Sequence, residues 1–463
     1  MRETMSVARK EFRSFFASPA AYLFLGAFVV AALFIFFWGE TFFARNIADL
    51  RLLFEWFPLL LIFLIAALTM HSWSDERRSG TLESLMTAPV SPSSLIVGKL
   101  LAGLALLVLA LALTFPLPIT VSVLGPLDWG PVVGGYVATI FLGVAYLSIG
   151  LCTSSQTDNP IIALILTALI CGVFYVIGAP VITDLFGYQV AHFLEQLGTG
   201  SRFDSITRGV LDFRDLLYYA TIAGVFLVLN RLALERFRWA GNPGNARHRA
   251  WTWGAVLAVA NLVVLNVWLA PVTTLRADLT EGNRYSLSET TSRTLSQLQE
   301  PLVIRGYFSE KTHPQLAPLV PRLRDLIREY EVVAGENVKI RFLDPTKNRE
   351  AEKKAASRYG VKPVPFQTSS RYQSSVVNSY FDVVVSYGDQ HETLGFRKLI
   401  DVQSGGGRDL SVSLNNPEYE LTRTIRKLKG QYAAGGDLFS GLGEPITLNA
   451  YISPSQQLPK PLR

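Results

Sequence analysis

Seven apolar runs, none of them interrupted by a charged side chain, occupy about half of the first 270 residues of the chain. Most are close to the roughly 20 residues that an α-helix needs to cross about 30 Å of hydrocarbon, and the two shorter ones can extend into their flanks. The pattern predicts a membrane-embedded, all-α region with seven spans. In chain order the runs are Ala20–Trp38, Phe57–Met70, Leu100–Val123, Val132–Leu151, Ile161–Pro180, Leu216–Asn230 and Trp251–Leu269.

The absence of Asp, Glu, Lys and Arg from these runs limits how the protein is powered. Ionisable groups are costly within lipid and usually mark the path of a proton or an ion. A secondary transporter driven by an ion gradient is therefore disfavoured. We expect the energy to come from another molecule.

Composition divides the chain into two halves. Residues 272–463 carry most of the charge and predict a soluble region large enough to bury its own core. This half has 26 Lys and Arg against 21 Asp and Glu, a net charge of +5 out of the chain's +6, which indicates a solvated surface and leaves an anionic partner as the alternative. A nucleic-acid partner is not expected. The two cysteines, Cys152 and Cys171, lie in or beside apolar runs, so we expect no disulfide in the second half.

Basic residues near the ends of the runs predict the orientation, because Lys and Arg concentrate on the cytoplasmic side of a bacterial inner membrane. With alternating spans, three basic clusters fall on one side, which makes the N-terminus cytoplasmic. Seven crossings then place residues 272–463 outside the cytoplasm. The first run is too long for the core of a signal peptide and is expected to remain as an anchor. The clusters are Arg2, Arg9, Lys10 and Arg13, then Arg77, Arg78 and Lys99, then Arg231, Arg236, Arg238, Arg247 and Arg249.

Aromatic residues recur at helical spacing shortly before the first run, and basic residues fall on the other faces. This pattern predicts an amphipathic helix that lies along the membrane surface. Ser18-Pro19 favours a break between this helix and the first span. The residues of the interfacial helix are Lys10, Glu11, Phe12, Phe15 and Phe16.

The loop between the second and third runs, His71–Lys99, carries the most informative pattern. Thr81 can cap a short helix that bears Leu82, Leu85 and Met86 on one face, with charged residues around it. A small apolar face on a charged loop must dock either on the protein's own helices or on a partner. The spacing leaves both alternatives open.

The same loop resembles the coupling segment of ABC type-2 permeases. The resemblance rests on Glu76, on the run from Gly80 to Leu85, on Ala88-Pro89-Val90 and on Gly98-Lys99, in that order. It implies that ATP-binding subunits grip this segment and move the spans. The ATPase-coupling residues that it implies are Glu76, Gly80, Thr81, Leu82, Glu83, Leu85, Met86 and Pro89.

A second segment resembles the outer region before the last span of the same family. It includes Arg208, Gly209, Asp212 and Asp215, which we term the outer signature. With the amphipathic start, the resemblance covers residues 1–240 and six spans. The implied protein is a non-catalytic permease without a cofactor of its own. No G-x-x-x-x-G-K-[ST] loop is present in the sequence, so ATP and Mg are expected on a partner ATPase, in a complex with a second permease chain.

Residues 241–271 are predicted to be a linker and a seventh, anchoring helix. Beyond them, Arg276-Ala-Asp278-Leu-Thr280 begins a region that resembles the auxiliary component of gliding-motility-type ABC systems. Residues 272–437 alternate strand and helix patterns and resemble a thioredoxin-like α/β domain, without the cysteines of a thiol oxidoreductase. We expect this extracytoplasmic domain to bind a substrate or a periplasmic partner. Its predicted elements are strands at Leu302–Phe308 and Val338–Leu343, helices from Leu319 to Tyr330, Glu350–Tyr359 and Pro417–Leu428, and a hairpin from Tyr380 to Phe396.

Residues 438–463 predict the start of a second, truncated repeat. Ser296-Gln-Leu298-Gln-Glu300-Pro301 recurs as Ser440-Gly-Leu442-Gly-Glu444-Pro445, and chance similarity between two strand entries is the alternative.

No catalytic or metal-binding residues are predicted, because the five histidines are scattered without ligand spacing. The leading functional hypothesis, which the resemblance implies, is the permease subunit of an ATP-driven ABC exporter. The alternative is a membrane-anchored scaffold that transmits force in a gliding or cell-surface apparatus and moves no solute.

Overall fold

The computed structural model describes residues 2–17, 19–39, 42–45, 48–183, 185–186, 188–238, 246–269, 275–282, 285–309, 316, 319–347, 349–369, 374–404 and 410–433. They belong to two compact units, Met1–Ser286 and Leu287–Arg463, which are described separately. The expected second repeat at 438–463 lies outside the described residues.

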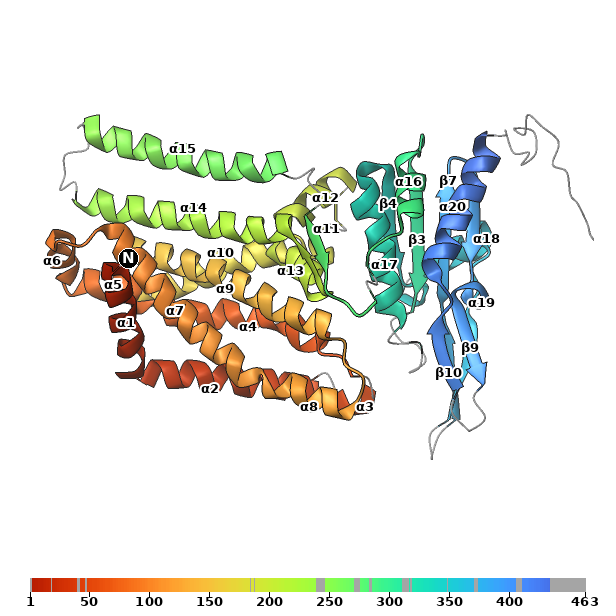
Figure 1. The fold of residues 1–463 in the computed structure, drawn as a ribbon, viewed down its shortest axis with the longest axis horizontal. Helices are drawn as coiled ribbons and strands as arrows, with labels where there is room; N and C mark the ends of the chain where they lie inside the picture. The colour runs from red at the N-terminus through yellow and green to blue at the C-terminus, as the bar shows by residue number, and fades with distance from the viewer. Residues whose placement is uncertain are drawn as a thin grey trace, which may run out of the picture. The chain divides into compact units, whose positions relative to one another are not determined.

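The first unit is a bundle of long helices (Figure 1). Six described helices are long and apolar enough to cross a membrane. They contain five of the seven predicted runs and all of the first run except Ala20. The remaining run, Ile161–Pro180, overlaps the 17-residue α10, which is about 26 Å long and ends at Val176. The six are Ala21–Gly39, Arg51–Arg78, Pro92–Leu124, Trp129–Gln156, Phe213–Phe237 and His248–Leu269.

The helices of this unit are α1 (Arg2–Ala17), α2 (Pro19–Phe34) with a π-helical end (Ile35–Gly39), α3 (Phe42–Arg45), α4 (Arg51–Thr69), α5 (His71–Arg78), α6 (Thr81–Thr87), α7 (Pro92–Thr114), α8 (Pro116–Leu124), α9 (Trp129–Gln156), α10 (Pro160–Val176), α11 (Pro180–Thr183), α12 (Tyr188–Leu197), α13 (Thr199–Thr207), α14 (Phe213–Arg238) and α15 (Ala246–Leu269).

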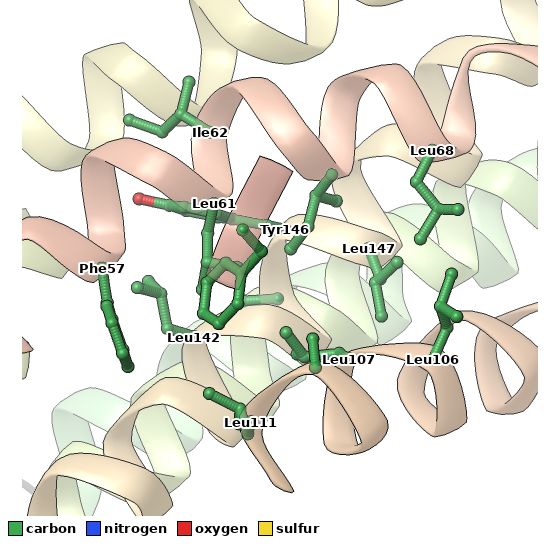
Figure 2. Packing of buried hydrophobic residues seen from close by; sticks show 14 of the residues in the cluster. Phe57, Leu61, Ile62, Leu68, Leu106, Leu107, Leu111, Leu142, Tyr146 and Leu147 are labelled. Atoms are coloured by element: carbon green, nitrogen blue, oxygen red, sulfur yellow. The ribbon is translucent and has the colours of Figure 1, made fainter. Parts of the chain in front are cut away.

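Helix α9 is the centre of the bundle and packs against α4, α7, α10, α13 and α14. Small residues allow this close packing, as in other membrane helices. A Cβ atom at Gly135 would overlap Phe54 of α4, and one at Gly143 would overlap Leu107 of α7. Figure 2 shows the resulting core, with Phe57, Leu61, Ile62 and Leu68 of α4, Leu106, Leu107 and Leu111 of α7, and Leu142, Tyr146 and Leu147 of α9.

Two helix starts follow directly from the sequence. The Ser91 hydroxyl accepts a 3.1 Å hydrogen bond from the Ser94 amide at the start of α7. The Asn159 side chain accepts a 2.9 Å hydrogen bond from the Ile161 amide at the start of α10. In both helices a proline follows the cap, where its missing N–H group costs nothing.

A two-stranded antiparallel ladder joins β1 (Val210–Asp212) to β2 (Arg276–Asp278), on either side of the α14–α15 hairpin. Val210 pairs with Asp278, and Asp212 pairs with Arg276. Helices α11 to α13, which precede β1, lie at the end of the bundle opposite α6 (Figure 1). The boundary between the units therefore follows Ser286 rather than residue 271, because β2 pairs within the first unit.

The second unit is built on a four-stranded sheet with the order β4-β3-β7-β8. Strands β3 (Leu302–Phe308) and β4 (Val338–Leu343) are parallel and are connected through α17 (Leu319–Ala334). Strand β7 (Phe381–Tyr387) is antiparallel to β3 and to β8 (Gln390–Leu394). The larger core forms against α16 (Glu289–Ser296), α17 and α20 (Pro417–Ala433).

The opposite face of this sheet carries a smaller core that contains Tyr307, Val384 and Ala355 of α18 (Arg349–Tyr359). The predicted strands, the three helices and the hairpin of this region are confirmed. Two further hairpins were not predicted. They are β5 (Val364–Ser369) with β6 (Ser374–Ser379), and β9 (Ile400–Ser404) with β10 (Leu410–Leu414), the latter preceded by the short α19 (Phe396–Leu399).

Candidate functional site

Lys99 is a buried cation near the start of α7, with 7% of its surface exposed. Its Nζ atom lies 3.2 Å from Oε1 of Glu11 on α1 and 3.1 Å from Oε1 of Glu76 on α5. The ring of Trp73, which is fully buried, lies 4.8 Å from the same Nζ atom. Buried charges persist when they are paired. Lys99 therefore links α1, α5 and α7 in one group, which we term the Lys99 cluster.

Helix α1 crosses α7 beside this cluster. A Cβ atom at Gly98 would lie 2.6 Å from Cγ1 of Val7 and 3.2 Å from the carbonyl oxygen of Thr4, so only glycine fits at the crossing. Ala8 of α1 is buried as well. The predicted interfacial helix thus packs on the bundle through one face. Of its predicted residues, Phe12, Phe15 and Phe16 are half-buried against the core and Lys10 is exposed.

Helix α5 is held at the end of α9 by hydrogen bonds. The Ser154 hydroxyl accepts from the amides of Trp73 at 3.0 Å and Ser74 at 3.2 Å. Nη1 of Arg77 donates a 2.9 Å hydrogen bond to the Ser155 carbonyl oxygen. These contacts fix α5 against the central helix, so a displacement of α5 would reach α9 directly.

The apolar face of α6 packs on the chain's own core. Leu82 is 1% exposed, Met86 is 7% exposed, and Leu85 is half-buried against the same core. The structure places these three side chains on the protein's own helices, which is the second of the two alternatives. Burial of these three apolar side chains stabilises the packed position of α6 relative to a state in which they are exposed to water.

The start of α6 also differs from the prediction. Gly80 precedes the helix with φ +70°, and Thr81 is the first helical residue, so Thr81 is not the cap. Its hydroxyl instead donates a 3.3 Å hydrogen bond to the Glu76 carbonyl oxygen. The outward side of the α6 segment is polar. Its exposed residues are Gly80, Thr81, Glu83, Ser84, Thr87 and Pro89.

The outer signature lies at the other end of the bundle. Gly209 has φ +95°, which favours glycine, and its amide donates to the Ile206 carbonyl oxygen at 2.9 Å. A Cβ atom at Gly209 would lie 2.8 Å from Cγ2 of Thr280 and 2.9 Å from the backbone of Gly130 and Pro131. Gly209 therefore permits α9 and the segment after α15 to meet.

Charged members of the outer signature form local ion pairs. Asp215 accepts a 2.7 Å hydrogen bond from Nη1 of Arg202, and Asp212 pairs with Arg214. Arg208 is 9% exposed and donates to the Ser205 hydroxyl at 3.3 Å. These pairs stabilise the turn that carries β1.

Asp278, at the end of β2, organises the chain after the ladder. Its Oδ1 atom accepts from the Thr280 amide at 2.9 Å, and its Oδ2 atom accepts from the Tyr285 amide at 2.8 Å. Asp128, the cap of α9, accepts from the Glu281 amide at 3.3 Å. We term residues 276–286 the anchor segment, because it is bonded to the first unit along its described length.

The described residues at both ends form hydrogen bonds and ion pairs that hold segments of the bundle together. No group of three His, Cys, Asp or Glu side chains that could hold a metal ion occurs among the described residues. Cys152 and Cys171 are buried and unpaired with each other. The arrangement can transmit a displacement from α5 and α6 to α1, α7 and α9.

The sequence singled out Glu11, Glu76 and Lys99 separately but did not pair them, and it missed Trp73 and Ser154. The sequence did contain evidence for this pairing. Lys99 is the cation at the entrance of a long apolar run, and a cation buried there needs nearby acids. Since Glu11 and Glu76 lie in the flanking segments, pairing them with Lys99 was a natural hypothesis.

A bundle of long apolar helices, with an amphipathic helix and a short helix pair folded on one end, defines a multi-pass membrane protein. The model of the ABC-2 family transporter proteins matches residues 5–279. The chain belongs to this family. Membership implies an ABC ATPase as partner and a transmembrane subunit that is generally non-catalytic.

The family match extends beyond the expected permease boundary at residue 240 and includes α15 and β2. A second model, described as a domain of unknown function (DUF7088), matches residues 281–386. No curated protein matches the chain.

Proposed function

We propose that this chain is the permease subunit of an ATP-driven ABC exporter in a bacterial cytoplasmic membrane. The α6 end of the bundle is cytoplasmic, and the second unit is extracytoplasmic. The observation that carries the proposal is the Lys99 cluster, because it joins the segment that resembles a coupling segment to two further helices of the bundle.

The coupling residues divide into two groups in this proposal. The buried Leu82 and Met86 hold α6 on the bundle, and the exposed Thr81, Glu83 and Ser84 contact the ATPase. A push on the exposed side moves α6 and α5 together. The contacts of Lys99 and Ser154 then pass the displacement to α1, α7 and α9.

The test uses the full chain reconstituted in liposomes with its ABC ATPase. Glu83→Lys reverses an exposed charge on α6, and we expect it to lower the stimulation of ATP hydrolysis by at least about fivefold while leaving the melting temperature unchanged. Glu289→Lys is the matched control, since it reverses an exposed acid on α16 in the second unit. Full stimulation by the Glu83→Lys chain would contradict the proposal.

Orientation is tested separately by cysteine labelling. Ser84 and Glu281 are both exposed, and the two natural cysteines are buried. In intact spheroplasts a membrane-impermeant maleimide should label a Glu281→Cys chain and leave a Ser84→Cys chain unlabelled until the cells are lysed. The reverse pattern would invert the proposed topology.

The second unit is proposed to be a thioredoxin-like binding domain for a substrate or a periplasmic partner, as in gliding-motility-type auxiliary components. The order β4-β3-β7-β8 with one parallel pair supports the comparison with that fold. Residues 172–463 contain no cysteine, so binding rather than thiol exchange is the proposed use. A second permease chain completes the proposed complex.

A further inference from the structure

A groove of about 450 Å³ lies between α14 and α15, which run side by side (Figure 1). Val228, Arg231 and Leu232 of α14 form one wall, and small residues of α15, including Gly254 and Ala258, form the other. The volume falls within the range of ligand sites, about 300–1,000 Å³.

The two helices meet closely at their opposite ends, away from the groove. The Asn266 amide of α15 donates to the Thr221 hydroxyl of α14. Leu262 of α15 reaches within 3.1 Å of the position that a Cβ atom would take at Gly224. The groove therefore forms where α14 and α15 separate, near the C-terminal end of α14.

One side chain gives the groove its charge. Arg231 is the charged residue of the lining, and its guanidinium carbon lies 4.6 Å from the centre of the Trp251 ring. Its Nε atom is enclosed and has no hydrogen-bond partner among the described residues. A cation in an apolar groove with a free N–H donor is complementary to an anion that carries an apolar chain.

The position of Arg231 matches the depth of a lipid headgroup. It lies seven residues before the end of α14, or about 10 Å along a helix axis. Arg and Trp side chains concentrate at this depth, where hydrocarbon meets the headgroups. The exposed Arg236 and Arg249 lie near the same end of the two helices, and together with Arg231 they outnumber the buried Glu235 of α14.

We propose that this groove binds one anionic phospholipid, with an acyl chain between α14 and α15 and the phosphate group on Arg231. The excess of positive charge favours an anionic lipid over a zwitterionic one and over a second copy of this apolar helix pair. The site is independent of ATP hydrolysis, so its test does not depend on transport.

The experiment places the full chain in nanodiscs made of equal amounts of phosphatidylglycerol and phosphatidylcholine, and native mass spectrometry counts the lipids that remain bound. The unaltered chain should retain phosphatidylglycerol. Arg231→Gln should lower this retention about tenfold, because a charge-assisted hydrogen bond is lost. Arg231→Lys should keep most of it. Arg423→Gln, which neutralises an exposed arginine of α20 in the second unit, is the matched control and should behave like the unaltered chain.

A second variant fills the groove without changing its charge. A Cβ atom at Gly254 meets no heavy atom within 4 Å, so Gly254→Leu extends into open space and should also lose the lipid. If the unaltered chain retained phosphatidylglycerol and phosphatidylcholine equally, the bound lipid would be adventitious only, and the proposal would be overturned. Undiminished phosphatidylglycerol on the Arg231→Gln chain, or a dimer that Gly254→Leu dissociates, would overturn it as well.

Discussion

Nη2 of Arg51, at the start of α4, donates a 2.8 Å hydrogen bond to the hydroxyl of Tyr285, the penultimate residue of the anchor segment. The two residues are 234 positions apart in the chain. Together with the β1–β2 ladder, this bond attaches the end of the first unit to its second long helix. The anchor segment is therefore part of the bundle and not a free tether.

Asp278→Ala should loosen the anchor segment. The carboxylate accepts hydrogen bonds from the amides of Thr280 and Tyr285, and their loss should cost about 1–3 kcal/mol locally. We expect faster trypsin cleavage after Arg276, measured by mass spectrometry of the digested full chain. Asp344→Ala removes a similar aspartate–threonine turn in the second unit and should leave cleavage at Arg276 unchanged.

Lys99→Met should destabilise the first unit by about 3–5 kcal/mol, because Glu11 and Glu76 lose their buried cation. Thermal melting of the purified full chain measures the loss. Lys10→Met, which changes an exposed lysine of α1, should have little effect. Neutralising both acids as well, with Glu11→Gln and Glu76→Gln, should recover part of the stability. No recovery would show that Lys99 acts through packing alone.

Gly209→Ala should cost about 2–4 kcal/mol, because alanine is strained at φ +95° and its Cβ atom would collide with the backbone of Pro131. Gly172→Ala is the matched control. A Cβ atom there meets no heavy atom within 4 Å, and alanine favours the interior of α10, so a gain of roughly 0.5–1 kcal/mol is expected. Equal melting temperatures for the two variants would contradict the role of Gly209.

Asp382 should make the second unit sensitive to pH. Its side chain is 6% exposed, and burial raises the pKa of its carboxyl group to about 7. The folded state keeps this proton between about pH 4 and pH 7, whereas the unfolded state releases it. The free energy of unfolding should therefore fall as the pH rises through that window, by at most about 4 kcal/mol.

Asp382→Asn removes the titrating group and keeps the shape of the side chain. The variant should be more stable than the unaltered chain above pH 7, and this difference in the free energy of unfolding should shrink towards pH 4. Hydrogen–deuterium exchange of β7 peptides in the full chain, measured at both pH values, reports this difference. A constant difference between the two chains would contradict the assignment.

Local patterns predicted much of this fold. The apolar runs identify the long helices because each must satisfy its own backbone in lipid. Strands β3 and β4 begin and end where the sequence places them, since their apolar alternation is bounded by Pro301 and Asp344. The hairpins β5–β6 and β9–β10 were missed because segments such as Ser374–Ser379 are rich in serine and lack a strong apolar period.

The candidate site was harder to predict, because it depends on contacts between distant segments. The spacing of Leu82, Leu85 and Met86 shows that they share a face, but it does not show what covers that face. Their burial in the core was decided by tertiary packing. The partnership of Glu11 with Lys99, 88 residues apart, likewise became visible only when α1 was placed against α7.

The β1–β2 ladder has a consequence for biosynthesis. Val210 leaves the ribosome long before its partner Asp278, so the first strand waits without hydrogen-bond partners while α14 and α15 are inserted. An open strand edge invites pairing with foreign chains. The ladder can therefore form only late in assembly, after the chain that follows the last membrane helix has been synthesised.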